Sequence, residues 1–88
     1  MRTTFRKSFL RDLKKIKDES LLERIQKVIE RVEATDKIQQ ISDLKKISGT
    51  SGFYRIRVEG FRIGIAVEEN TVEFVRCLNR RDIYKYFP

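Results

Sequence analysis

Residues 53–67 read Phe-Tyr-Arg-Ile-Arg-Val-Glu-Gly-Phe-Arg-Ile-Gly-Ile-Ala-Val, which is two alternating runs separated by Glu59-Gly60. An acidic residue followed by glycine between two such runs is typical of a tight β-hairpin turn. Side chains alternate between the two faces of a strand, so one face of the predicted hairpin is apolar along its whole length. The opposite face carries Arg55, Arg57 and Arg62, with small residues between them. We expect this arginine face to carry the function.

The length and charge of the chain limit what it can be. Its 88 residues predict a single domain spanning residues 1–88, with one modest hydrophobic core. Twenty Lys and Arg against thirteen Asp and Glu give a formal net charge of +7. This excess favours an anionic partner, either nucleic acid or an acidic protein, over a basic surface that serves solubility alone.

The residue types that are missing exclude several kinds of site. There is no histidine, so histidine metal ligands, Ser-His-Asp triads and nucleases that use a histidine pair are excluded. Cys77 is the only cysteine, which rules out an internal disulfide and a thiolate metal cluster, and we expect its thiol to be buried. We therefore expect no metal and no cofactor. The first residues lack the apolar run of a signal peptide, and no segment approaches membrane-spanning length, so we expect a cytoplasmic protein.

The first half of the chain predicts a short strand and two helices. Thr3–Phe5 has β-branched and aromatic character. Ser8 is a candidate cap for a first helix, and Ser20 with Glu23 forms a capping-box pattern before a second helix over residues 21–33. Both helices carry apolar stripes at helical spacing. Their short connection predicts an antiparallel helical hairpin.

The second half predicts a meander and a tail. Residues 42–46 suggest a short helical turn, and residues 48–52 have loop composition. After the hairpin, residues 71–78 form a further strand with apolar residues on both faces, and residues 79–88 form a basic, aromatic tail with one helical turn. The predicted fold is α+β: a short N-terminal strand, and an antiparallel helical hairpin packed on one face of a mainly antiparallel four-stranded sheet. The arginine face is expected to remain open beside the tail.

Arginines gathered on one face suit phosphate, because the planar guanidinium donates paired hydrogen bonds and stays charged. Arg80 or Arg81 of the tail is expected to join the strand arginines. The alternative is that the arginines lie along the sheet and pair with glutamates. Tyr84 and Tyr86 either stack on splayed bases beside these cations or anchor the tail on the sheet.

Five segments together resemble the RelE/ParE superfamily of toxins from type II toxin–antitoxin systems. They are residues 4–13, 54–58, 60–63, 74–76 and 79–85. The order of strand, two helices, meander and tail also fits this superfamily, and the resemblance covers essentially the whole chain.

The resemblance implies the RelE-like activity: a metal-independent, ribosome-dependent endoribonuclease that cuts mRNA in the A site and halts translation. The ribose 2′-hydroxyl attacks the adjacent phosphate and leaves a 2′,3′-cyclic phosphate. By this resemblance the expected catalytic residues are Arg57, Arg62, Arg81 and Tyr84. The expected RNA-binding residues are Lys45, Lys46, Arg55, Arg80 and Tyr86, and the register of the tail leaves Arg80 as the alternative to Arg81.

Two features depart from the pattern of this superfamily. Related chains often carry histidine where this chain has Asn79, and Arg57 stays protonated and is a poor general base. Tyr84 is therefore the candidate proton acceptor. A ParE-like toxin that inhibits gyrase, and a non-catalytic basic module that binds nucleic acid, remain the alternatives.

A toxin of this superfamily implies partners. We expect an acidic antitoxin that folds on binding, the ribosome with its A-site mRNA, and promoter DNA that is contacted only through the antitoxin complex.

Overall fold

The computed structural model describes all 88 residues and has three α-helices, one 3-10 helix (η1) and a five-stranded sheet. The sheet order is β1-β5-β4-β3-β2; β1 runs parallel to β5 and the other neighbours are antiparallel. In chain order the elements are β1 (Arg2–Phe5), α1 (Lys7–Lys14), α2 (Glu19–Ala34), η1 (Ile38–Gln40), β2 (Leu44–Lys46), β3 (Phe53–Val58), β4 (Phe61–Glu68), β5 (Thr71–Asn79) and α3 (Arg80–Tyr86).

The predicted α+β fold is confirmed, with one correction to the sheet. We expected four strands and a helical turn over residues 42–46, but Leu44–Lys46 is a fifth strand that pairs with β3. Pairing with β4 satisfies only one edge of β3, and without β2 the backbone groups of the other edge would have no strand partner. Leu44 lies opposite the buried Ile56, so this strand adds apolar contact as well as hydrogen bonds.

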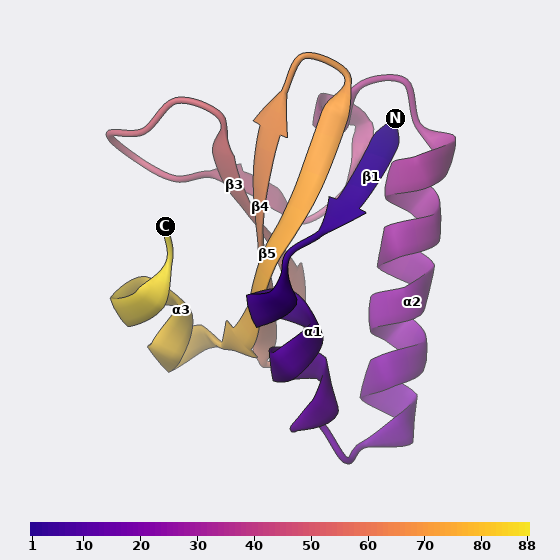
Figure 1. Cartoon of the computed structure of the whole chain (residues 1–88), viewed down its shortest axis with the longest axis vertical. Helices are drawn as coiled ribbons and strands as arrows, with labels where there is room; N and C mark the ends of the chain where they lie inside the picture. The colour runs from indigo at the N-terminus through magenta and orange to yellow at the C-terminus, as the bar shows by residue number, and fades with distance from the viewer.

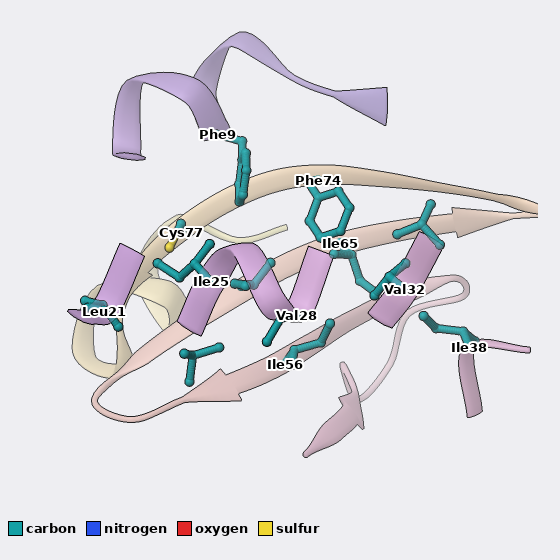
Figure 2. Close-up of a cluster of buried hydrophobic side chains, with 13 residues drawn as sticks. Phe9, Leu21, Ile25, Val28, Val32, Ile38, Ile56, Ile65, Phe74 and Cys77 are labelled. Carbon is teal, nitrogen blue, oxygen red and sulfur yellow. The ribbon is translucent and has the colours of Figure 1, made fainter. Parts of the chain in front are cut away.

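The main core lies between the helical hairpin and one face of the sheet (Figure 2). Ile25, Val28 and Val32 of α2 are buried and point toward the sheet, where they meet Ile56 and Ile65. This is the apolar hairpin face that the alternating sequence predicted.

Neither α2 nor any other helix combines the length and apolarity needed to cross a membrane.

Both predicted helix caps are wrong. Asp18, not Ser20, caps α2: its carboxylate accepts from the backbone N–H groups of Ser20 and Leu21 at 3.0 and 3.2 Å, so the helix begins at Glu19. A carboxylate at this position also complements the helix dipole. Ser8 lies inside α1, and its hydroxyl donates to the Val75 carbonyl at 2.6 Å.

Helix α1 completes the outer edge of β5 where β1 ends. The parallel pairing of β1 stops at Phe5 opposite Phe74, which leaves the next part of the β5 edge without a strand partner. Besides the Ser8 hydroxyl, the Asp12 carboxylate accepts from the Cys77 N–H at 2.9 Å and from the Arg76 guanidinium at 2.8 Å. Side chains of one helix thus replace a strand along this edge.

The opposite face of the sheet is only half open. Helix α3 covers one part of it (Figure 1), where Ile83 and Phe87 pack with Val75 in a second small core. The Phe87 ring lies directly over Gly64, and its edge meets Phe53 at a centroid distance of 5.8 Å. We expected the whole arginine face to be open; the tail instead leaves only the arginine end uncovered.

This contact predicts that Gly64→Ala destabilises the protein. A Cβ at Gly64 would lie 2.8 Å from the ring atoms of Phe87, which is itself 6% exposed. The free energy of unfolding should fall by about 1–3 kcal/mol, the usual cost of overpacking. Gly60→Ala is the control, because its Cβ would have no neighbour within 4 Å. Denaturant unfolding measures both, and equal stability of the two variants would contradict the account.

Burial of Cys77 predicts an unreactive thiol. The residue is 2% exposed, and burial raises the pKa of its thiol from 9.0 to about 12. The folded protein should therefore resist alkylation near pH 8, whereas the denatured chain reacts, because only the thiolate is nucleophilic. The thiol of the unfolded chain ionises first, so the free energy of unfolding should fall as pH rises from about 9 toward 12. Rapid alkylation without denaturant would show that the thiol is not buried.

Candidate functional site

The pairing of β2, β3 and β4 brings four cations to one face. Lys45 lies opposite Arg55, and Arg57 lies opposite Arg62. Directly paired residues share a face, so all four side chains project on the side that α3 only partly covers. Lys46 lies opposite Tyr54, whose side chain packs in the main core, so Lys46 belongs to the other face. The structure does not bring Lys46 to the other predicted RNA-binding residues.

Helix α3 supplies the rest of the site through its own periodicity. Ile83 faces the sheet, and Arg80 and Tyr84, four residues apart, share the adjacent helical face. The charges acting on the Arg62 guanidinium come from Tyr84, Arg55, Arg57 and Arg80, and Arg81 is not among them. Arg80 is therefore the tail arginine that we group with Arg62, because its charge acts on that guanidinium. We call Arg55, Arg57, Arg62 and Arg80 the arginine cluster.

Tyr84 lies over the arginine cluster. Its ring centroid is 4.7 Å from the Arg55 guanidinium carbon, and its side chain is largely exposed. A hydrogen bond with Arg55 lowers the pKa of the phenol, and the charges of Arg55, Arg62 and Lys45 lower it further. Tyr86 does not join them, because its ring lies over Arg76, 6.0 Å from that guanidinium carbon.

The cluster is far from neutralised by carboxylates. Among its members only Arg57 has a carboxylate partner, Asp43, with Nη2 and Oδ1 2.8 Å apart. Arg62 donates to the backbone carbonyls of Glu59 and Phe61 at 2.8 and 2.9 Å. Nη1 of Arg55 is buried and has no hydrogen-bond partner in the protein. The expected alternative, arginines paired with glutamates along the sheet, is not what these strands show.

Burial and like charge both act on Arg62. Desolvation is the main cause that lowers the pKa of its guanidinium, and the positive charges of the other three cluster arginines lower it as well. Such a guanidinium remains protonated, and an incoming anion would relieve the repulsion. The arrangement can therefore hold a phosphate group.

The sequence analysis missed three features of the structure. Asp43 lies in an irregular segment, yet it lines the same hollow as Lys45, Arg55, Arg57 and Arg62. Asp12 sits on the apolar side of α1 among buried residues, where the periodicity alone predicted an ordinary helix face. Asn79 caps α3 by accepting from the N–H groups of Arg81 and Asp82, each at 3.0 Å, which gives its side chain a structural task.

Comparison with known proteins places this geometry in a family. The ParE toxin of type II toxin–antitoxin systems (parDE) matches residues 4–84. The chain belongs to this toxin family. Toxin RelE3 of Methanocaldococcus jannaschii is 40% identical over 89 residues, covering the whole of both chains.

Solved structures of the family share the fold. The toxin in the RelB–RelE antitoxin–toxin complex from Methanococcus jannaschii has a TM-score of 0.82 and 40% identity, over 97% of this chain and 99% of that one. The archaeal RelE–RelB complex from Pyrococcus horikoshii has a TM-score of 0.73 at 18% identity, over 90% and 93% of the two chains. The YoeB dimer from Staphylococcus aureus has a TM-score of 0.74 at 19% identity, over 91% and 97%. These comparisons bear out the resemblance to the RelE/ParE superfamily.

Proposed function

We propose that this toxin is an endoribonuclease that cuts mRNA bound to the translating ribosome. The observation that carries the proposal is the arginine cluster, four guanidinium groups with a single carboxylate partner, placed under an exposed tyrosine. The 40% identical relative named Toxin RelE3 favours the RelE-like branch of the superfamily.

The chemistry proposed is attack of a ribose 2′-hydroxyl on the neighbouring phosphate. Negative charge builds on the phosphorane, and preorganised guanidinium groups stabilise it because they need not reorganise during the reaction. Arg62 is fixed by two backbone carbonyls and Arg57 by Asp43, so both are held in place before RNA binds. The ribosome supplies the in-line geometry that so small a protein lacks. This route forms a 2′,3′-cyclic phosphate without a metal.

Binding of the RNA is assigned to the rim of the cluster. The Tyr84 ring and the Arg55 guanidinium form a stacked pair on which an unstacked base can continue, and base–aromatic stacking contributes about 1–3 kcal/mol. Lys45 adds charge beside them. Arg80 takes the position at the phosphate that we first gave to Arg81, and neither Lys46 nor Tyr86 has a role at the cluster in this proposal.

A cognate antitoxin is the proposed protein partner. The relatives from Methanococcus jannaschii and Pyrococcus horikoshii were solved as antitoxin–toxin complexes. The net charge of +7 suits an acidic, amphipathic antitoxin segment that folds on the toxin surface. Contacts to promoter DNA are assigned to the antitoxin within that complex.

Gyrase inhibition is the second candidate, because the family that matches residues 4–84 is named for ParE. Induction of the toxin in cells separates the two. Primer extension that finds new mRNA ends inside translated codons supports the nuclease, whereas arrested replication with intact mRNA supports gyrase inhibition. Absence of toxicity would leave only a non-catalytic binding module.

A further inference from the structure

The hollow over the arginine cluster contains one carboxylate, that of Asp43. The residues lining it are Asp43, Leu44, Lys45, Arg55, Arg57 and Arg62. Asp43 holds Arg57 in place, but its negative charge also repels a phosphate ligand and occupies one guanidinium nitrogen. The presence of a carboxylate in this hollow therefore suggests that Asp43 takes part in the reaction as well as in holding Arg57.

Asp43 is fixed to Arg57 at two points. Its backbone carbonyl accepts from the Arg57 N–H at 3.1 Å, and its Oδ1 accepts from Arg57 Nη2 at 2.8 Å. Its backbone adopts a positive φ of 63°, a conformation that aspartate tolerates better than most residues. The carboxylate is still partly open to solvent, with 46% of the side chain exposed, so a substrate can reach it.

No other group in the hollow is suited to accept a proton. Arginine and lysine side chains hold theirs, and the chain has no histidine. Tyr84 carries a phenolic proton, and the hydrogen bond from Arg55 that lowers its pKa makes it a better proton donor. Asp43 is the one carboxylate that lines the hollow, and the Arg57 side chain bonds only its Oδ1, so lone pairs remain available on the carboxylate.

We propose that Asp43 is the general base of the reaction and Tyr84 its general acid, an assignment that rests on the proposed nuclease function. It replaces our first expectation that Tyr84 accepts the proton. The Asp43 carboxylate takes the proton of the 2′-hydroxyl as the bond from the 2′-oxygen to phosphorus forms. The bond from phosphorus to the 5′-oxygen breaks, and the 5′-oxygen takes the Tyr84 phenolic proton. Asp43 then releases its proton to water and Tyr84 regains one, so the cycle closes without a cofactor.

Arg57 can hold the general base and the reacting phosphate next to each other. A guanidinium has five N–H donors, and the side chain of Arg57 uses one nitrogen, Nη2, for Asp43. Its remaining donors are available to the phosphate, which sets the carboxylate and the phosphate side by side on one guanidinium. The 2′-hydroxyl lies next to that phosphate in RNA, within reach of the base.

The test compares Asp43→Asn with Glu59→Gln in cleavage of mRNA on purified ribosomes at saturating toxin. Glu59 pairs with Arg24 at 2.9 Å and is 45% exposed, so it matches the Asp43–Arg57 pair, but it does not line the hollow that contains Asp43, Arg55, Arg57 and Arg62. The substitution changes only the side chain and keeps the backbone carbonyl that accepts from Arg62. Asp43→Asn should slow the single-turnover rate about 100-fold, the low end for general acid–base catalysis, with ribosome binding equal or tighter. Glu59→Gln should cut like the wild type, and Asp43→Glu should recover part of the rate.

An mRNA with sulfur in place of the scissile 5′-oxygen separates base from acid, because a thiolate leaves without a proton. This substrate should restore the rate of Tyr84→Phe and leave Asp43→Asn slow. The base assignment is overturned if Asp43→Asn cuts as fast as the wild type or faster, if the sulfur substrate rescues it, or if its loss of rate tracks a loss of thermal stability. If the wild-type protein does not cut mRNA, the nuclease proposal itself is wrong. If the wild type cuts and Asp43→Asn cuts equally fast, only the assignment of Asp43 as general base is wrong.

Discussion

Arg62→Ala should lower the rate of mRNA cleavage on the ribosome by about 10²–10³-fold, the usual effect of removing one preorganised donor to a developing anion. Arg62 is central to the arginine cluster: Arg55, Arg57, Arg80 and Tyr84 all act on its charge. Two backbone carbonyls hold its guanidinium in place, so a lysine ammonium, which lacks the planar fork of donors, cannot reproduce its position. Arg62→Lys should therefore recover only a small part of the rate. Single-turnover cleavage with purified ribosomes measures the effect.

Arg80 and Arg81 of α3 provide a control that separates the position of an arginine from its charge. The charge of Arg80 acts on the Arg62 guanidinium, whereas Arg81 is not among the charges that act on it. Arg80→Ala should thus reduce cleavage strongly and Arg81→Ala only slightly, although both remove one positive charge from the same helix. A larger loss in Arg81→Ala would show that the wrong arginine has been placed at the phosphate.

Asp12→Ala should lower the free energy of unfolding by about 2–4 kcal/mol, because it leaves buried donors without partners. Asp12 is 5% exposed and accepts three hydrogen bonds, two from Arg76 and one from the Cys77 N–H. Arg76 keeps 26% of its side chain exposed and can recover some solvation, which keeps the expected loss below that of a fully buried pair. Denaturant unfolding monitored by circular dichroism gives the value.

Glu73→Ala is the control for Asp12→Ala, since it breaks another ion pair between β5 and the segment that leads into α1. The Arg6–Glu73 contact is 2.6 Å long but sits at the surface, with 53% and 34% of the side chains exposed. Its loss should cost less than about 1 kcal/mol. Equal destabilisation by the two variants would mean that Asp12 acts as an ordinary surface charge.

The sequence predicted the parts of the fold that depend on periodicity. Alternation in residues 53–67 predicted both the hairpin and its apolar face, and the spacing in α2 predicted which side is buried. The three-residue strand β2 was missed because so short a segment has no period, and its state depends on the free edge of β3. The prediction that Ser8 caps α1 was wrong because its hydroxyl donates to the carbonyl of Val75 in β5, a strand distant in the sequence.

For the candidate site too, the sequence predicted only what depends on the periodicity of single elements. Arg55, Arg57 and Arg62 share a face because of strand alternation, which a sequence displays directly. The choice of Arg80 over Arg81 depends on the rotation of α3 about its axis, which Ile83 and Phe87 set by packing on the sheet. Asp43 reaches Arg57 only through the pairing of β2 with β3, a long-range contact with no local signature.

Analysis of the ends of an mRNA incubated with the wild-type toxin and purified ribosomes tests the central claim most directly. The account predicts cleavage within ribosome-bound codons that yields a 2′,3′-cyclic phosphate and a 5′-hydroxyl, and no cleavage of the same mRNA without ribosomes. Intact mRNA on ribosomes that the toxin has saturated, or ends that carry a 5′-phosphate, would contradict it.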